Sequence, residues 1–311
     1  MTAPTLDSIT SSLRRSFIMF AHVNALLEKM EKLFSHECTN EEAENLFIIG
    51  ESGVGKSRLL QKFSLAHPRI THAEFTEIPV LYVKVPATGS IDSLLYAMLL
   101  EMVSPFWDRG TTAQRTAQLH TLLKSCKVRL IILGELNHLI DKGGSVTHHK
   151  IADWLKAFAE EAKISFIISG IPRSLKLMDK NEQLRGRFRE VITIHPFSME
   201  DPETRHQFYS ALKTFSKLMP GIPCVNLTTE ATAKSILYAT AGRLRDIRNL
   251  LVRSVELAFK NSKVEITQEI LSQAFTQVIY VNAPRERNPF DKEFKAYPLI
   301  KAGEPFAPRE E

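Results

Sequence analysis

One stretch of the sequence has the residue types and spacing that bind a phosphate group. Gly50, Gly55, Lys56 and Ser57 fill the fixed positions of the pattern G-x-x-x-x-G-K-S. Glycines let consecutive backbone N–H groups curl around an anion, and the N-terminus of the following helix adds a positive dipole end. The lysine is expected to reach the β and γ phosphates, and the serine hydroxyl to ligate Mg²⁺. The pattern predicts a nucleoside triphosphate site, and the alternative is a chance glycine turn before a helix.

The residues expected to contact this nucleotide form one continuous run and one more distant arginine. They are Gly50, Glu51, Ser52, Gly53, Val54, Gly55, Lys56, Ser57, Arg58 and Arg245. Arg245 follows Gly242 by three positions at the start of a predicted helix, where an arginine can fold back on the γ-phosphate and sense its loss. An exposed basic helix face explains the same pattern about equally well.

A second group of polar residues follows two apolar strands. The run 128–133 ends at Gly134-Glu135, a place where ATPases with a phosphate loop commonly carry an acidic pair. Glu135 is expected to polarise the attacking water, or else is a solvated charge at a strand end. Gly134 cannot support a metal ion, so slow hydrolysis is expected. Ser169, at the end of the next strand, is the candidate for orienting water.

Three arginines stand shortly before the last predicted strand. Arg187 directly precedes Phe188, which is expected to be buried and so to fix the position of the arginine. A guanidinium held there can stabilise transition-state charge on the nucleotide of a neighbouring subunit. A solvated basic edge is the alternative.

The elements that must position these residues alternate between strand and helix over the first two-thirds of the chain. Predicted strands span 46–49, 79–86, 128–133, 164–168 and 191–194, and predicted helices span 10–34, 57–67, 90–103, 112–126 and 151–162. Such alternation indicates an α/β fold with a parallel sheet covered by helices. Further on, only helical patterns follow, at 205–218, 229–241, 244–259 and 267–275.

These patterns predict four segments. An N-terminal helical segment spans 1–40, an α/β nucleotide-binding domain 41–198, a small helical lid domain 199–281 and an extended tail 282–311. Prolines interrupt every possible helix of the tail, and Phe290, Phe294 and Phe306 stand between them. Phenylalanines in a segment that cannot fold alone are typical of a partner-binding peptide.

Composition indicates which class of protein the chain belongs to and where in the cell it is expected. The 311 residues are 44% hydrophobic and 24% charged, as in an ordinary soluble domain, and carry a net charge of +5. The three cysteines are far apart in sequence, which predicts neither a disulfide framework nor a metal site. The chain has no apolar run long enough for a membrane helix and no signal peptide pattern, so a cytoplasmic location is expected. The mild basic charge is compatible with nucleic acid without demonstrating it.

Together these motifs resemble the AAA+ ATPases, a superfamily with a P-loop fold, and within them the TniB/TnsC family of transposition regulators. The resemblance covers about residues 10–280. It rests on Gly50–Ser57, Leu81–Pro86, Leu130–Ile140, Ile167–Pro172, Gln183–Phe188 and Gly242–Arg248, with Asn288-Pro289-Phe290 in the tail. The family pattern has an aspartate where this chain has Gly134.

The resemblance implies a bacterial, ATP- and Mg²⁺-dependent homo-oligomer, a ring or filament, around double-stranded DNA. Such proteins link a target-selection protein to the transposase, and they contact the DNA backbone without sequence readout. The candidate DNA contacts are Arg109, Arg115, Lys142 and Lys150. Two other functions stay open: a replication-initiator or clamp-loader type AAA+ ATPase, and an ATP-binding scaffold with little turnover.

Overall fold

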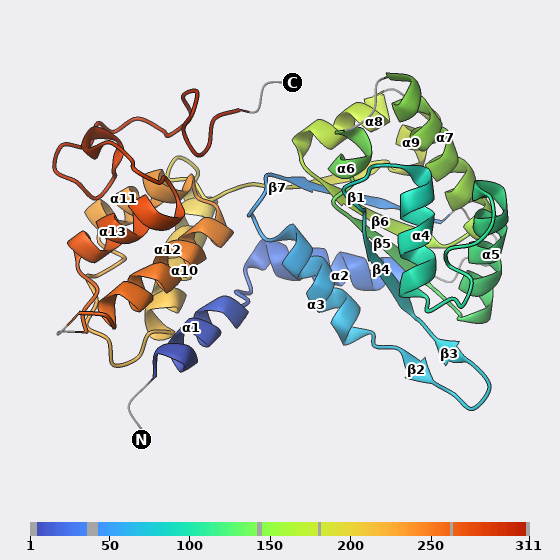
Figure 1. The fold of residues 1–311 in the computed structure, drawn as a ribbon, viewed down its shortest axis with the longest axis horizontal. Helices are drawn as coiled ribbons and strands as arrows, with labels where there is room; N and C mark the ends of the chain where they lie inside the picture. The colour runs from blue at the N-terminus through green and yellow to red at the C-terminus, as the bar shows by residue number, and fades with distance from the viewer. Residues whose placement is uncertain (1–4, 36–42, 142–144, 180–181, 262–263, 309–311) are drawn as a thin grey trace. The chain divides into compact units, whose positions relative to one another are not determined.

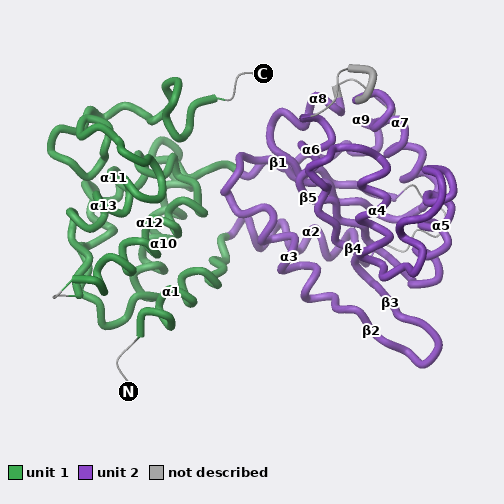
Figure 2. The backbone as a smooth tube through the Cα atoms, in the orientation of Figure 1, with its two compact units in different colours: residues 1–20, 195–311 green, residues 21–194 purple. Residues whose placement is uncertain are grey.

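The computed structural model describes residues 5–35, 43–141, 145–179, 182–261 and 264–308. The chain forms two compact units, residues 21–194 and residues 1–20 with 195–311 (Figure 2). We call them the α/β unit and the helical unit. The sequence predicts one N-terminal segment, 1–40, but the boundary between the units falls inside it. Helix α1 (Leu6–Arg15) is part of the helical unit, and α2 (Ala21–Ser35) is part of the α/β unit.

Five parallel strands form the sheet of the α/β unit, in the order β4-β5-β6-β1-β7. Their bounds are Leu46–Gly50 for β1, Val80–Lys84 for β4, Leu130–Gly134 for β5, Ser165–Gly170 for β6 and Glu190–Ile194 for β7. Strands β1, β5 and β6 are buried along their whole length, as near-continuous apolar runs predict for central parallel strands. The predicted α/β fold with a parallel sheet is confirmed.

Helices cover both faces of this sheet (Figure 1). One face, which includes Phe47, Leu133 and Phe166, packs in a single apolar core with residues of α4 (Ile91–Glu101), α5 (Thr112–Ser125) and α7 (Ser145–Ala162). On the other face lies α3 (Lys56–Ala66), which contacts β1, β4 and β5 and packs against α2. Parallel strands buried in this way read as continuous apolar runs, which is why the sequence locates them well.

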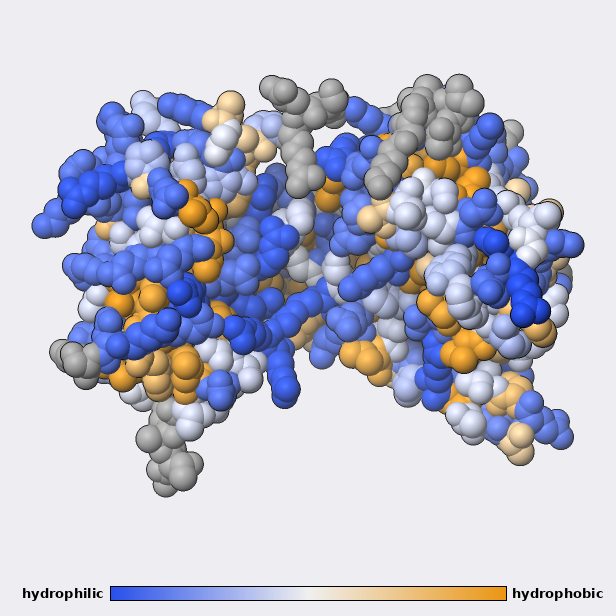
Figure 3. All heavy atoms as spheres, viewed as in Figure 1, coloured by the Kyte–Doolittle hydropathy of each residue, from blue (hydrophilic) through white to orange (hydrophobic). Residues whose placement is uncertain are grey.

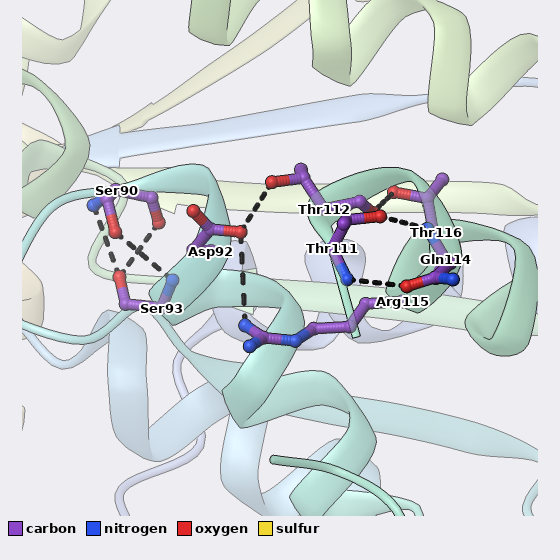
Figure 4. Close-up of polar contacts among 8 residues, drawn as sticks. All are labelled: Ser90, Asp92, Ser93, Thr111, Thr112, Gln114, Arg115 and Thr116. Atoms are coloured by element: carbon purple, nitrogen blue, oxygen red, sulfur yellow. Dashed lines mark hydrogen bonds and ion pairs between the residues drawn. The ribbon is translucent and has the colours of Figure 1, made fainter. Parts of the chain in front are cut away.

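Side-chain caps fix the starts of α4 and α5 next to each other (Figure 4). The Ser90 hydroxyl accepts a hydrogen bond from the Ser93 N–H at 3.1 Å, and the Thr111 hydroxyl accepts one from the Gln114 N–H at 3.3 Å. The Thr112 hydroxyl then donates to the Asp92 carboxylate at 2.7 Å. Because caps satisfy N–H groups that have no partner inside a helix, they set where each helix begins.

Several short elements are not predicted by the sequence. They are the hairpin of β2 (Ile70–Thr71) and β3 (Thr76–Glu77), and the helices α6 (Asn137–Ile140), α8 (Leu175–Asp179) and α9 (Glu182–Arg187). Helix α7 begins at Ser145 rather than near Ile151. Its first turns are polar and carry no apolar periodicity, which is the signal that locates a helix in a sequence.

Among its described residues, the helical unit has α1 and four α-helices beyond residue 195. They are α10 (Pro202–Lys217), α11 (Glu230–Thr240), α12 (Leu244–Ala258) and α13 (Gln268–Val278). Helix α1 lies against α12, with the Arg14 guanidinium 2.9 Å from the Glu256 carboxylate. An apolar stripe of Ile9 and Leu13 is buried in this contact region, so α1 is a structural part of the unit.

The described part of the tail, up to residue 308, is folded onto the helical unit. Phe290 is only 4% exposed and its ring lies 6.3 Å from the ring of Phe275 on α13. The Arg287 guanidinium pairs with the Glu304 carboxylate, Nε to Oε1 at 2.6 Å, and both side chains are buried. Phe306 is buried as well. Phe290 and Phe306 are therefore buried within their own unit, and partner binding by the tail stays a prediction.

Among the residues that the structure describes, no helix has the length and apolar character needed to cross a membrane. Hydrophilic side chains spread over the visible face of each unit, with separate apolar patches between them (Figure 3).

Candidate functional site

The loop between β1 and α3 has the backbone that a phosphate site requires. Gly53 and Gly55 have φ angles of 90° and 115°, a region that favours glycine. A Cβ atom on Gly50 would lie 2.4 Å from the carbonyl oxygen of Ile194 on β7, so this position accepts no side chain. Helix α3 begins directly after Gly55 and directs its N-terminal N–H groups toward the loop.

Lys56 lies at the centre of this loop and is only 6% exposed. Its ammonium group donates to the carbonyl oxygens of Gly50, at 2.6 Å, and Glu51, at 2.9 Å. Carbonyl dipoles stabilise a buried positive charge. An ammonium group held in this way is suited to bind an anion in the loop.

One hydrogen bond connects the phosphate loop to the residues that follow β5. The Ser57 hydroxyl, on the first turn of α3, donates to the Glu135 carboxylate at 2.9 Å. Glu135 has a φ of 63°, which is uncommon for a residue with a side chain and typical of functional sites. The next residue, Leu136, donates its N–H to the Ser169 carbonyl oxygen at 2.8 Å. The Ser57 side chain therefore contacts Glu135 directly, and the Ser169 backbone is bonded to the residue after Glu135, near the ends of β5 and β6.

A residue to which the sequence gives no role lies beside this group. Tyr82 on β4 faces Gly134, and a Cβ atom on Gly134 would stand 3.5 Å from the Tyr82 hydroxyl oxygen. That oxygen is buried and has no hydrogen-bond partner among the described residues. Burial raises the pKa of Tyr82 to about 12, and the Glu135 carboxylate adds to the rise. Only the pairing of β4 with β5 brings Tyr82 and Gly134 together, so no local sequence pattern points to it.

Arg187 lies at the end of α9 and is tied to its own unit. Its guanidinium is 2.8 Å from the Glu160 carboxylate of α7, and 22% of its side chain is exposed. The Asn45 side chain donates to the Arg187 carbonyl oxygen at 3.2 Å, which fixes the backbone there. Phe188 is buried, as the sequence predicts.

Arg245 belongs to the helical unit, on the first turn of α12. Half of its side chain is exposed, and its Nε atom lies 3.0 Å from the carboxylate of Asp246. The other predicted nucleotide contacts, Glu51, Ser52, Gly53, Val54 and Arg58, all lie in the loop after β1 or at the start of α3. The structure therefore brings Lys56, Ser57, Glu135 and Ser169 together within the α/β unit.

The four candidate DNA contacts differ in exposure. Arg109 and Lys150 are exposed. The side chain of Arg115 is only 19% exposed, and its guanidinium lies 3.9 Å from Asp92 (Figure 4). The Arg115 side chain is thus mostly buried beside Asp92 at the start of α4, and Arg115 as a DNA contact stays a prediction. Lys142 lies outside the described residues.

Solved structures with a similar fold come from proteins with low sequence identity. Cdc6p from Pyrobaculum aerophilum matches with a TM-score of 0.64 and 16% identity, over 89% of this chain and 72% of that one. The Aeropyrum pernix ORC1 protein in complex with DNA gives a TM-score of 0.61 and 15% identity, over 89% and 70%. The Aeropyrum pernix ORC2 protein in its ADPNP and ADP complexes gives 0.60 and 13%, over 86% and 71%. At such identity the likeness establishes the AAA+ fold, as predicted.

No curated protein matches the chain in sequence. The family model described as bacterial TniB protein matches residues 9–198, which include the phosphate loop, Glu135, Ser169 and Arg187. The match runs from residue 9 to residue 198, so it covers a shorter stretch than the resemblance over about residues 10–280 that the sequence indicates. It nevertheless covers more than half of the chain, and this chain belongs to the TniB family.

Proposed function

We propose that this chain is an ATP-dependent regulator of transposition that assembles on double-stranded DNA and links target-selection proteins to the transposase. The single observation that carries the proposal is the bond between Ser57 and Glu135, which joins the phosphate loop to the acidic strand end at 2.9 Å. In a TniB-family chain with an AAA+ fold, this pair supplies both the metal-side hydroxyl and the water-activating carboxylate.

The residues around the loop fit ATP and Mg²⁺. Backbone N–H groups at the start of α3 and the buried Lys56 ammonium offer hydrogen bonds and positive charge to a triphosphate. The Ser57 hydroxyl and the Glu135 carboxylate are oxygen donors, which Mg²⁺ prefers. When bound, the ion would neutralise charge on the phosphate oxygens. Lys56 would then exchange its carbonyl contacts for phosphate oxygens.

Hydrolysis in this proposal depends on Glu135. Its carboxylate accepts a proton from, or polarises, a water molecule near the γ-phosphate, and Ser169 at the neighbouring strand end helps to orient that water. Gly134 leaves the metal side without the usual carboxylate, so turnover is slow. A slow ATPase suits an assembly that must persist on DNA until the transposase arrives.

Assembly brings a second subunit to the site. Arg187 is the candidate arginine finger, and its pair with Glu160 lies at the surface, where Glu160 is 41% exposed. An ion pair of this kind contributes only about 0–1 kcal/mol, so the guanidinium can exchange it for a phosphate at little cost. Arg245 would act as the sensor of the γ-phosphate from the helical unit.

DNA binding in the proposal uses phosphate contacts rather than base readout. Arg109 and Lys150 are exposed cations of the α/β unit, and Lys142 is a further candidate. Contacts of this kind give affinity that falls with salt and does not depend on sequence. The ORC1 neighbour was solved in complex with DNA, which is compatible with this use of the fold.

A second candidate function is an ATP-binding scaffold with little turnover, and Gly134 favours it. In that case nucleotide would hold the assembly together and hydrolysis would have no role. The two candidates share nucleotide-dependent assembly and differ only in whether Glu135 matters.

The shared step is tested by Lys56→Ala, with Lys62→Ala as the matched control. Both lysines lie on α3, but Lys62 is exposed. Because bonds to charged groups are worth about 1.5–3 kcal/mol, Lys56→Ala should weaken binding of a fluorescent ATP analogue by about 10- to 100-fold. Assembly on duplex DNA, seen by negative-stain microscopy with a non-hydrolysable analogue, should disappear. Normal assembly of Lys56→Ala on DNA would contradict the proposal.

A further inference from the structure

Position 134 is the one place in the site where the chain lacks a side chain that its family pattern supplies. The structure shows what lies there instead. The nearest atoms to a Cβ atom at Gly134 would be Tyr82 Cε2 and the Tyr82 hydroxyl oxygen, both at 3.5 Å, and the Val83 carbonyl oxygen at 3.8 Å. These are ordinary van der Waals distances. The space beside Gly134 can therefore hold a Cβ atom, and the Tyr82 side chain forms one wall of that space.

The β-sheet fixes this relation. Strand β4 pairs with β5 in parallel, with Tyr82 opposite Ile132 and Lys84 opposite Gly134. The Val85 N–H donates to the Gly134 carbonyl oxygen at 2.8 Å, which holds the two strand ends together. The tyrosine ring therefore extends along β4 toward the end of β5, where Glu135 follows directly.

The Tyr82 hydroxyl is also an unusual group energetically. It is removed from solvent, and no described residue accepts or donates a hydrogen bond to it. A buried hydroxyl without a partner is energetically unfavourable, so its presence calls for a role that the ligand-free protein does not satisfy.

We propose that the Tyr82 hydroxyl is the positioning group that takes the place of the missing carboxylate at position 134. It donates a hydrogen bond to water at the Ser57–Glu135 end of the site when nucleotide and Mg²⁺ are bound. The inference rests on the proposed ATP site and goes beyond it, because it assigns a role to a residue that is not among the predicted catalytic or binding residues. A hydroxyl stays neutral and can only orient water, whereas a carboxylate also adds negative charge. With Tyr82 in place of the carboxylate, the water is still oriented, but its electrostatic interaction with the protein is weaker.

Tyr82→Phe tests this directly, because it removes the hydroxyl and keeps the ring. The primary readout is metal binding: free Mn²⁺ is followed by electron paramagnetic resonance in the presence of the full chain and a non-hydrolysable ATP analogue. Loss of one hydrogen bond should raise the Mn²⁺ concentration for half-saturation by about fivefold. Binding of a fluorescent ATP analogue without metal should stay unchanged, because Lys56 and the loop are untouched.

Tyr96→Phe is the matched control. Tyr96 lies on α4 with its ring 4.6 Å from the ring of Trp107, and it is not among the nearest neighbours of a Cβ atom at Gly134, so its loss of a hydroxyl should leave Mn²⁺ binding as in the wild type. A thermal melt of the ligand-free protein completes the design: Tyr82→Phe should melt at the wild-type temperature or above it, since no described bond is lost. Unchanged Mn²⁺ binding in Tyr82→Phe overturns the inference, whatever the melt gives. If wild-type protein itself binds no ATP analogue, the proposed function fails instead.

Discussion

The phosphate loop after β1 and the strand ends of β4 and β5 build the two ends of the candidate site in different ways. The loop is made of consecutive residues, and its groups are mostly backbone: glycine conformations, helix N–H groups and the carbonyls that hold Lys56. The strand ends depend on side chains from separate strands, with Tyr82 from β4 beside Gly134 and Glu135 from β5. The phosphate loop, which binds mainly through its backbone, depends on very few side chains. At the strand ends, which bind through side chains, a side chain that is missing on one strand can be replaced by a side chain of the neighbouring strand.

Glu135→Gln has the largest expected effect, because it should lower turnover, which depends on the strand ends, and leave nucleotide binding by the loop unchanged. The amide keeps the size of the side chain and removes the base, so turnover should fall by about 10²- to 10⁴-fold. Nucleotide binding should remain, because the loop and Lys56 are unaffected. Steady-state phosphate release and binding of a fluorescent ATP analogue measure the two properties in one preparation. Equal turnover in both proteins would favour the scaffold function.

The two ends also differ in how far the sequence predicts them. Gly50, Gly55, Lys56 and Ser57 form a short local pattern whose chemistry depends on backbone geometry, so the loop follows from the sequence. The three central strands β1, β5 and β6 are predicted as well, because buried parallel strands are apolar throughout. The edge strands β4 and β7 are predicted too, although they are only partly buried. Glu135 and Ser169 follow from their places after such strands.

Contacts between distant segments are what the sequence leaves out. The approach of Tyr82 to Gly134 depends on strand pairing, and the pair of Arg187 with Glu160 joins α9 to α7. In the tail up to residue 308, prolines coincide with a lack of long helices, but they say nothing of the buried ion pair between Arg287 and Glu304. Side-chain partners far apart along the chain have no periodicity or spacing by which a sequence could reveal them.

Arg187→Ala tests whether the site is complete within one chain, with an expected effect of intermediate size. Removing one donor to a transition state costs on the order of 10²-fold in turnover. The loss should appear only under assembly conditions. Mixing Arg187→Ala with Lys56→Ala should restore part of the activity, since each supplies what the other lacks. Arg189→Ala, on an exposed neighbour, is the control. If no mixing ratio restores activity, Arg187 does not act in trans.

Gly134→Asp has the smallest expected effect and compares the two ways of building the strand-end half. The structure leaves room for the new Cβ, and the carboxylate would come within reach of the Tyr82 hydroxyl. An added charge near the Ser57–Glu135 pair should lower the Mg²⁺ needed for turnover and raise the rate by about threefold to tenfold, the equivalent of about one hydrogen bond. Filament lifetime on DNA should shorten accordingly. ATPase assays across a Mg²⁺ titration measure both quantities.

The double variant Gly134→Asp with Tyr82→Phe makes the comparison quantitative. If the hydroxyl and the carboxylate serve the same water, the effect of Tyr82→Phe on the Mg²⁺ requirement should shrink toward none once Asp is present. Independent groups would instead give additive effects, as distant sites usually do. Gly134→Ala, which adds the Cβ alone, controls for the volume of the new side chain. An unchanged Mg²⁺ requirement in Gly134→Asp would mean that another group already orients the metal-side water. In that case the strand ends of β4 and β5, like the phosphate loop, would lack no group that the reaction needs.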